Sequence, residues 1–239
     1  MKKKIVVIII VFIILFWIYR IQYPDVVTFT SKKEGPVLTI VGGTHGNEPA
    51  GANACFLLIE YLKKNPIKRG KVVVIPNANP IGLFFNKRNI PFELNYYNIK
   101  GEYDLNRNYF DKDRRVNTDI VTSQVLKSDW VLDLHEGWSF HKLDSASMGS
   151  GIYAGKTQES KAVIPFLVEA VNETIKDDEY KFISVDWPDL EGTLRMMCDN
   201  NKINYVLVET SGQNDVQPMY IRVEQHLVII HRLLDYLKC

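Results

Sequence analysis

Residues 37–64 read VLTIVGGTHGNEPAGANACFLLIEYLKK, and this stretch decides the fold of the chain. The opening run, residues 37–41, is almost wholly apolar or β-branched and predicts a strand that stops at Gly42 and Gly43. From Pro49 to Lys64 apolar side chains recur at helical spacing, and Pro49 suits the first turn of a helix. A strand that leads through a short loop into an amphipathic helix is typical of α/β domains.

The same alternation continues along the rest of the chain. We expect an α/β fold in which a mostly parallel, mixed sheet is flanked by helices and forms a single domain over residues 24–239. Residues 77–101 are rich in loop-forming residues. The expected strands are 71–76, 130–134 and 205–208, with a further one within 23–36, and the expected helices are 118–127, 163–175 and 223–237.

Composition excludes two classes of protein. Residues 1–23 contain four of the 29 Lys and Arg residues and none of the 28 Asp and Glu residues. Residues 24–239 therefore have 25 cations against 28 anions, a net charge of −3. This charge gives no indication of a basic surface for nucleic acid. Three cysteines in no motif argue against a disulfide framework and against a thiolate metal site. A bridge between Cys55 and Cys198 stays open as an alternative to two buried thiols.

The N-terminal segment predicts a membrane anchor. Three lysines precede the uncharged run of residues 5–19, which spans about 22 Å of the roughly 30 Å hydrocarbon core, and Arg20 can snorkel to lengthen the span. A cleaved signal peptide is the rival reading, but it needs small residues after the apolar run and bulky ones stand there. We therefore expect residues 1–23 to be an uncleaved single-pass anchor, with the domain on the non-cytoplasmic side of the membrane.

Two histidines and one carboxylate form a candidate metal site. His45 and Glu48 share one tight, glycine-rich loop, and His135 follows a separate apolar run. Two imidazoles with one carboxylate are the ligand set of a hydrolytic zinc site that keeps one position for water. The alternative is a surface loop with incidental polar residues.

Other polar residues follow strands or sit in loops. Glu209 ends an apolar run and is a candidate general base beside such a metal, or merely a solvated strand end. Asp133 lies two residues before His135, on the same strand face, and either holds the ring of that ligand or satisfies nearby backbone groups. Asn106 and Arg107 are adjacent in a loop and could bind a carboxylate, although such pairs are often solvated.

Five ordered motifs resemble the zinc carboxypeptidases, and in particular the succinylglutamate desuccinylase/aspartoacylase family. The resemblance covers roughly residues 37–212, nearly the whole of the expected domain. The motifs are Gly42-Gly43-Thr44-His45-Gly46-Asn47-Glu48, Asn79-Pro80-Ile81-Gly82, Asp104-Leu105-Asn106-Arg107, Asp133-Leu134-His135 and Val208-Glu209.

The resemblance implies a role for each motif. It implies one zinc ion per chain, held by His45, Glu48 and His135, with Glu209 as the base. It also implies that Asn106 and Arg107 hold a substrate carboxylate and that an arginine polarises the scissile carbonyl.

Two departures from the family pattern bear on the substrate. In the desuccinylase branch, the arginine that polarises the carbonyl lies just before the Asp-Leu-Asn-Arg motif. This chain has Lys100 and no arginine in that stretch. We therefore assign the role to Arg88, whose separation from the motif is closer to that seen in the peptidases. Arg195 falls where peptidases place their specificity pocket, and it either receives an acidic substrate or is structural. The chain is also short for the additional C-terminal domain of aspartoacylases.

The expected function is hydrolysis of an amide bond in an N-acyl amino acid or a short peptide with a free carboxylate. The alternatives are a zinc carboxypeptidase that acts on cell-wall or extracellular peptides, and a non-catalytic relative that binds a metal or a carboxylate.

Overall fold

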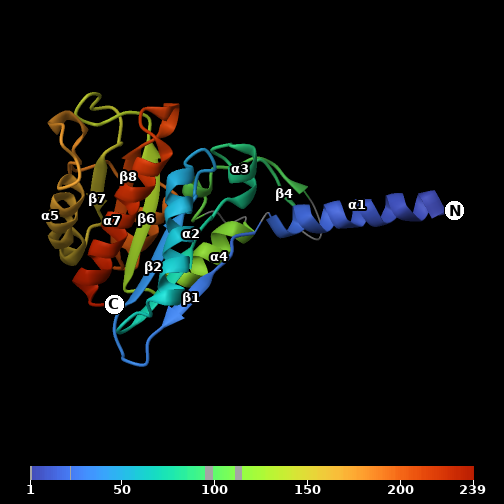
Figure 1. The fold of residues 1–239 in the computed structure, drawn as a ribbon, viewed down its shortest axis with the longest axis horizontal. Coiled ribbons are helices and arrows are strands. Elements are labelled where there is room, and N and C mark those ends of the chain that lie inside the picture. The colour runs from blue at the N-terminus through green and yellow to red at the C-terminus, as the bar shows by residue number, and fades with distance from the viewer. Residues whose placement is uncertain (1, 22, 95–98, 111–114) are drawn as a thin grey trace.

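Six strands form one twisted sheet in the computed structural model, which describes residues 2–21, 23–94, 99–110 and 115–239 (Figure 1). The strand order across the sheet is β1-β3-β2-β6-β8-β7. The strands are β1 (Val27–Thr30), β2 (Val37–Gly42), β3 (Lys71–Ile75), β6 (Trp130–Gly137), β7 (Gly151–Ala154) and β8 (Asn204–Ser211).

The four central strands are parallel and the two edge strands are antiparallel to their neighbours. The expected mostly parallel, mixed sheet is therefore confirmed. In a parallel arrangement the carboxyl ends of β2, β6 and β8 share one edge of the sheet, where ligand sites of open α/β folds gather. In the β6–β8 register His135 lies opposite Glu209.

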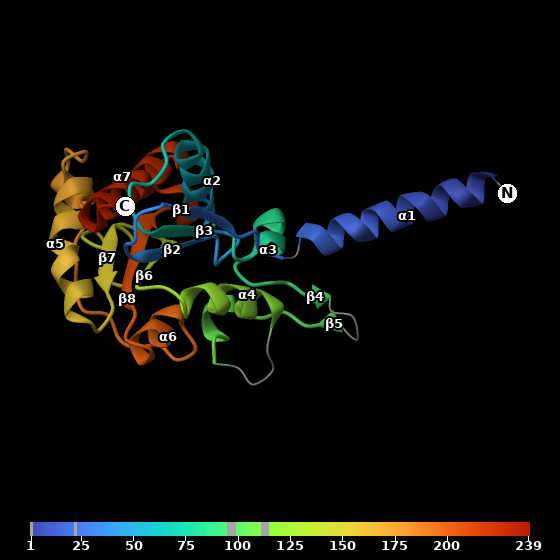
Figure 2. The same cartoon turned by 90° about the horizontal axis from the view of Figure 1, so that it is seen from below.

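Helices cover both faces of the sheet (Figure 2). Helices α2 (Pro49–Lys64), α5 (Gln158–Asn172) and α7 (Met219–Leu237) pack on one face, where their apolar side chains join those of alternate strand positions such as Leu38 and Ile40. On the other face α4 (Val116–Val125) and α6 (Leu194–Asn200) contribute to a second buried cluster with Val41 and Val131. Side chains alternate between the faces of a strand, so consecutive residues feed the two clusters.

The two clusters also settle the cysteines. Cys55 is buried in the α2 cluster and Cys198 in the α6 cluster, on opposite faces of the sheet. The sheet between them prevents a bridge, and all three cysteines are free.

Several elements differ from their predicted extents. Helix α5 begins at Gln158, five residues before its predicted start, because the Thr157 side chain caps it by accepting from Ser160 N; Pro165 then lies inside the helix rather than in its first turn. Strand β7 and helix α6 were not predicted, since both are short. The loop-rich stretch 77–101 contains helix α3 (Pro80–Phe85), capped by Asn79, and the strand pair β4 (Glu93–Leu94) and β5 (Ile99–Lys100). Three 3₁₀ turns complete the fold: η1 (Leu105–Arg107), η2 (Asp178–Tyr180) and η3 (Gln213–Asp215).

Helix α1 (Lys2–Ile21) projects away from the α/β body (Figures 1 and 2). Its side chains from Ile5 to Ile13, and that of Phe16, are exposed. Within the part of the chain that the structure describes, no helix is sufficiently long and apolar to cross a membrane, so the anchor predicted over residues 1–23 finds no support.

Candidate metal centre

The predicted metal ligands meet at the carboxyl edge of the sheet. His45 and Glu48 lie in the loop that follows β2, and His135 lies near the end of the neighbouring strand β6. Glycines allow this loop to turn tightly. Gly43 has φ of +61°, and a Cβ on Gly46 would lie 2.0 Å from the carbonyl carbon of Gly82, so no larger residue fits there without moving backbone.

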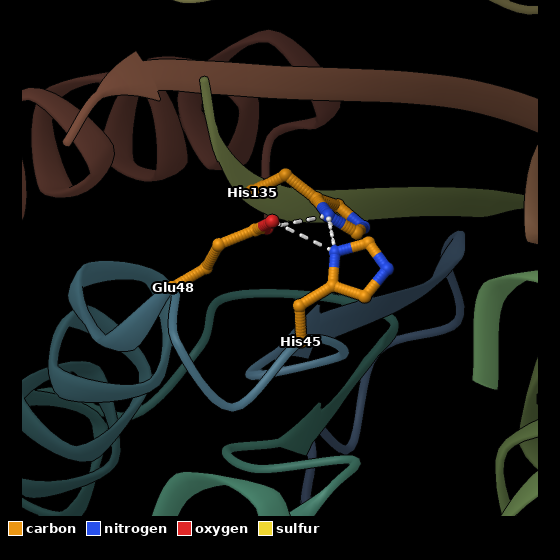
Figure 3. Close-up of side chains that lie close together, drawn as sticks. All are labelled: His45, Glu48 and His135. Carbon is orange, nitrogen blue, oxygen red and sulfur yellow. Dashed lines mark hydrogen bonds and ion pairs between the residues drawn. The ribbon is translucent and has the colours of Figure 1, made fainter. Parts of the chain in front are cut away.

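The three side chains converge on one point (Figure 3). His45 Nδ1 lies 2.9 Å from Glu48 Oε1, His135 Nδ1 lies 2.9 Å from Glu48 Oε2, and the two Nδ1 atoms are 3.1 Å apart. All three residues are at most 3% exposed. One ligand atom from each lies within 4.8 Å of the others, a mixed nitrogen and oxygen set that fits a divalent cation such as zinc.

The electrostatics of this cluster favour a carboxylate on Glu48. Burial alone would raise the pKa of Glu48, but the charges of His45 and His135 and their hydrogen bonds outweigh it, and the pKa falls well below its ordinary value. Burial likewise opposes the charged form of His135, yet Asp133 and Glu48 raise the pKa of that imidazole well above its usual range. A buried, ionised carboxylate flanked by two imidazoles is prepared to receive a cation.

A second carboxylate lies behind each histidine. Asp104 Oδ1 is 3.2 Å from His45 Nε2, and Asp133 Oδ1 is 3.3 Å from His135 Nε2, the latter without the alignment of a good hydrogen bond. Asp133 Oδ2 accepts from the hydroxyl of Tyr205 at 2.8 Å. Carboxylates at this position can fix the orientation of a ligand ring, and the short distance to His135 Nε2 favours the first of the two roles considered for Asp133.

Glu209 opens into the same pocket from β8 and is 8% exposed. Burial raises its pKa to about 8; the positive charge of His135 opposes the shift, and the negative charges of Glu48 and Asp133 add to it. A carboxyl group with a pKa near neutrality can both take up and release a proton.

Arg88 reaches the centre from the loop after α3. Its Nη1 lies 3.3 Å from Glu48 Oε1 and its Nε lies 3.3 Å from Asp104 Oδ2. The side chain remains 42% exposed and lines the same pocket as the metal ligands. The structure thus brings Arg88 next to Glu48, while its assigned role towards a scissile carbonyl stays a prediction.

Asn106 and Arg107 lie on η1 at the pocket wall. Asn106 Oδ1 accepts from Leu194 N at 3.0 Å, and no other described residue forms a hydrogen bond with its amide nitrogen. Arg107 Nη1 donates to its neighbour's carbonyl oxygen at 2.6 Å, and among the described residues no carboxylate lies within ion-pair distance of this guanidinium. Arg107 is exposed and lines the cavity.

Arg195 also lines the pocket, but its charge is already matched. It lies 3.8 Å from Asp189 and 3.7 Å from Asp199, and it donates to the carbonyl oxygen of Trp187 at 3.0 Å. These contacts favour the structural reading of this arginine over direct binding of an acidic substrate.

All eight predicted site residues line one cavity of about 360 Å³, a size that suits a small ligand. The remaining wall is largely apolar and aromatic. It includes Trp138, Met148, Trp187, Pro188, Leu190 and Leu207.

Two features of the site were missed by sequence reasoning. Gln213, on η3 after β8, donates its side-chain amide to Glu48 Oε1 at 2.8 Å. Glu136 is buried on the opposite strand face from His135 and pairs with Arg222 Nη1 at 2.5 Å. The only sequence signal for Gln213 is its place four residues after Glu209, in a Gly-Gln-Asn-Asp run that is typical of a turn.

The fold of this chain is similar to those of several solved structures. The chain superposes on the tripeptide-bound cell shape determinant protein Csd4 of Helicobacter pylori with a TM-score of 0.72 and 21% identity, covering 90% of this chain and 55% of that one. A succinylglutamate desuccinylase/aspartoacylase from Rhodobacter sphaeroides gives a TM-score of 0.62 and 17% identity, covering 89% of this chain and 58% of that one. At these identities the likeness is one of fold.

Sequence comparison gives two kinds of curated relative. An N-alpha-acetyl-L-2,4-diaminobutyric acid deacetylase of Halomonas elongata is 30% identical over 111 residues, 46% of this chain and 31% of that protein. Carboxypeptidase D of Anas platyrhynchos is 29% identical over 120 residues, 44% of this chain and 9% of that protein. The chain thus spans less than a third of the length of these relatives.

The family model described as the Succinylglutamate desuccinylase/Aspartoacylase catalytic domain matches residues 34–148. This match includes the three predicted metal ligands together with Arg88, Asn106 and Arg107. It confirms the resemblance on which the site was predicted, because residues 34–148 of this chain match the catalytic-domain model of this family.

Proposed function

We propose that this chain is a zinc-dependent hydrolase that cleaves the amide bond of an N-acyl amino acid or a short peptide with a free carboxylate. The observation that carries the proposal is the buried His45–Glu48–His135 cluster, which shares one cavity with Glu209 and with the guanidinium of Arg107. Relatives named as a deacetylase and as carboxypeptidases support the same class of reaction.

One zinc ion per chain would be held by the two imidazoles and the Glu48 carboxylate. When bound, zinc supplies Lewis acidity, which polarises a carbonyl group and makes water more acidic. The chain's own residues then have to bind the substrate, orient it and move one proton.

Glu209 is the proposed proton carrier. Its raised pKa, about 8 in the metal-free protein, places the carboxyl group where it can accept a proton from water and return it to the departing amine nitrogen. Its register opposite His135, one of the proposed metal ligands, supports this role.

The two arginines, Arg88 and Arg107, have different proposed roles. Arg88 is held by Glu48 and Asp104 at the mouth of the ligand cluster, where it can stabilise negative charge that develops on the carbonyl oxygen. Arg107, with the Asn106 amide beside it, would bind the substrate carboxylate and so fix the orientation of the scissile bond.

A panel of substrates tests the proposal. The full chain, loaded with zinc, is incubated with N-acetyl and N-succinyl amino acids and with dipeptides, and amine release is measured beside the Glu209→Gln variant. We expect release from at least one substrate class by the wild type and almost none by the variant. Stoichiometric zinc binding with no turnover on any member would instead indicate a non-catalytic binding relative.

A carboxypeptidase is the second candidate, and Arg88 favours it. Arg88 lies beside Glu48. Its spacing from the Asp104 motif in the sequence resembles that of the peptidases more than that of the desuccinylases, which supports this candidate. The same panel distinguishes the two, because a carboxypeptidase prefers peptides with an amino-acyl residue over simple acetyl or succinyl groups.

Location outside the cytoplasm, and with it an extracellular peptide as substrate, stays a prediction from the N-terminal sequence alone. Mass spectrometry of the protein isolated from its native cells, with cell fractionation, tests it.

A further inference from the structure

The turn after β8 is built so that one side chain points back into the metal centre. Gly212 is in close contact with Glu136, because a Cβ at this position would lie 1.5 Å from Glu136 Oε2. The next residues, Asn214 and Asp215, have φ of +66° and +53°, a left-handed conformation that Asn and Asp tolerate better than most residues. This backbone path directs the side chain of Gln213 towards Glu48.

The hydrogen bonds of Gln213 fix the orientation of its amide. Its Nε2 donates to Glu48 Oε1 at 2.8 Å and to the carbonyl oxygen of Glu136 at 2.5 Å. The backbone carbonyl oxygen of Glu136 can only accept a hydrogen bond, so the amide nitrogen rather than the amide oxygen must face it. An amide nitrogen has two donor hydrogens, and both are used within the protein.

Glu136, whose backbone carbonyl accepts from Gln213, is itself fixed by the hydrogen bonds of its side chain. The carboxylate of Glu136 accepts from Ala50 N, at the start of α2, at 2.6 Å and from Arg222 Nη1, on α7, at 2.5 Å. Arg222 also donates to the carbonyl oxygen of Gly212 at 3.1 Å. The buried Glu136–Arg222 pair therefore joins four segments around Gln213: the start of α2, the end of β6, the turn after β8, and α7.

We propose that Gln213 is a positioning residue which holds the Glu48 carboxylate in the orientation required to bind the metal. This inference rests on the proposed metal site. It follows from the geometry because Gln213 contacts a ligand directly, has no donor hydrogen left for a substrate, and is fixed from behind by a buried ion pair. Outer contacts of this kind typically contribute about 10- to 100-fold to metal affinity.

The test compares metal affinity with apo stability. Gln213→Met keeps the approximate length of the side chain and removes the donor, and Gln124→Leu, a glutamine on α4 outside the site, is the matched control. Zinc dissociation constants are measured by competition with a chromophoric chelator, and thermal unfolding of the chelated proteins is measured in parallel. We expect Gln213→Met to weaken zinc binding about tenfold or more, with the control equal to wild type.

Two further readouts separate positioning from other roles. At saturating zinc, Gln213→Met should keep KM near that of the wild type, whereas a residue that binds substrate would change KM. Gln213→Glu, which sets a second carboxylate against Glu48, should weaken zinc binding at least as much as Gln213→Met if geometry and the donated hydrogen are what matter.

The outcomes are distinct. A wild-type chain that binds no zinc would overturn the proposed function itself. A wild type that binds zinc, together with a Gln213→Met variant of equal affinity, would overturn only the role of Gln213. A parallel loss of apo stability and metal affinity in Gln213→Met would mean that Gln213 supports the turn in general, and this too would overturn the inference.

Discussion

Replacing Glu209 by Gln should abolish most activity while making the metal-free protein more stable at high pH. The amide nearly preserves the shape of the side chain but cannot take up a proton. General acid–base catalysis contributes about 10²–10⁴-fold, so kcat should fall by at least that order while zinc stoichiometry remains one per chain. Near-normal kcat in the variant would remove Glu209 from the proton-transfer role.

The stability effect follows from the raised pKa of the buried carboxyl group. Its ordinary value is 4.5, and burial raises the pKa in the folded, metal-free chain to about 8. Between these values the folded state keeps a proton that the unfolded state has lost, so the Glu209 contribution is fully present below about pH 4.5 and is lost as the pH rises towards 8. The limiting slope is about 1.4 kcal/mol per pH unit.

Denaturant unfolding of chelated wild type and Glu209→Gln at several pH values measures this difference. The difference in free energy of unfolding, variant minus wild type, should increase between pH 5 and pH 8. This increase cannot exceed about 4 kcal/mol. Taking the difference between the two proteins cancels the titration of the histidines to first order. A gain below about 1 kcal/mol, or one of opposite sign, would refute the argument that Glu209 is held protonated by burial.

Three further changes have defined outcomes. His135→Ala should lose stoichiometric zinc in metal analysis, because one of three ligands is removed; full retention would sink the ligand assignment. Arg107→Ala should lower kcat/KM at least about tenfold for a substrate with a free carboxylate but hardly at all for its amide, so that equal losses on both would end the carboxylate-binding role. Gly46→Ala should lower the free energy of unfolding by about 1–3 kcal/mol in denaturant melts and weaken zinc binding, because the new Cβ would meet the backbone of Gly82. Gly101→Ala is the control and should behave as wild type, because no atom lies within 4 Å of a Cβ at that position.

The sequence predicts the ligand loop well because its constraints are local. Helix α2 begins and ends at its predicted residues, Pro49 and Lys64, since the apolar periodicity and the proline act within a single segment. Gly43 likewise has a local reason, its positive φ, whereas Gly46 is required by a tertiary contact with the backbone of Gly82. Arg88 could be assigned only through the family resemblance, because its approach to Glu48 depends on how the loop after α3 folds back over the site.

Gln213 could not be predicted for a different reason. Its partners are Glu48 and the backbone of Glu136, which lie 165 and 77 residues away in the chain. A glutamine in a polar turn has the same local pattern whether its amide faces solvent or a metal ligand. Only the close approach of Gly212 to Glu136, which is a tertiary contact, distinguishes the two.

The C-terminal end of β6 shows why the extent of this strand was predicted incorrectly. The apolar run predicts a strand that stops at Leu134, but β6 continues to Gly137, and His135 and Glu136 are both buried within it. Alternation places His135 on the face of the cavity and Glu136 on the face of α2 and α7, where Arg222 neutralises it. Two adjacent polar residues thus serve opposite sides of the sheet: one supplies a candidate metal ligand, and the other anchors the helices and the turn that surround it.

A buried ion pair is costly in isolation and contributes little net stability. Its value here lies in geometry, since the same strand that carries the ligand also fixes the backbone carbonyl that holds Gln213 against Glu48.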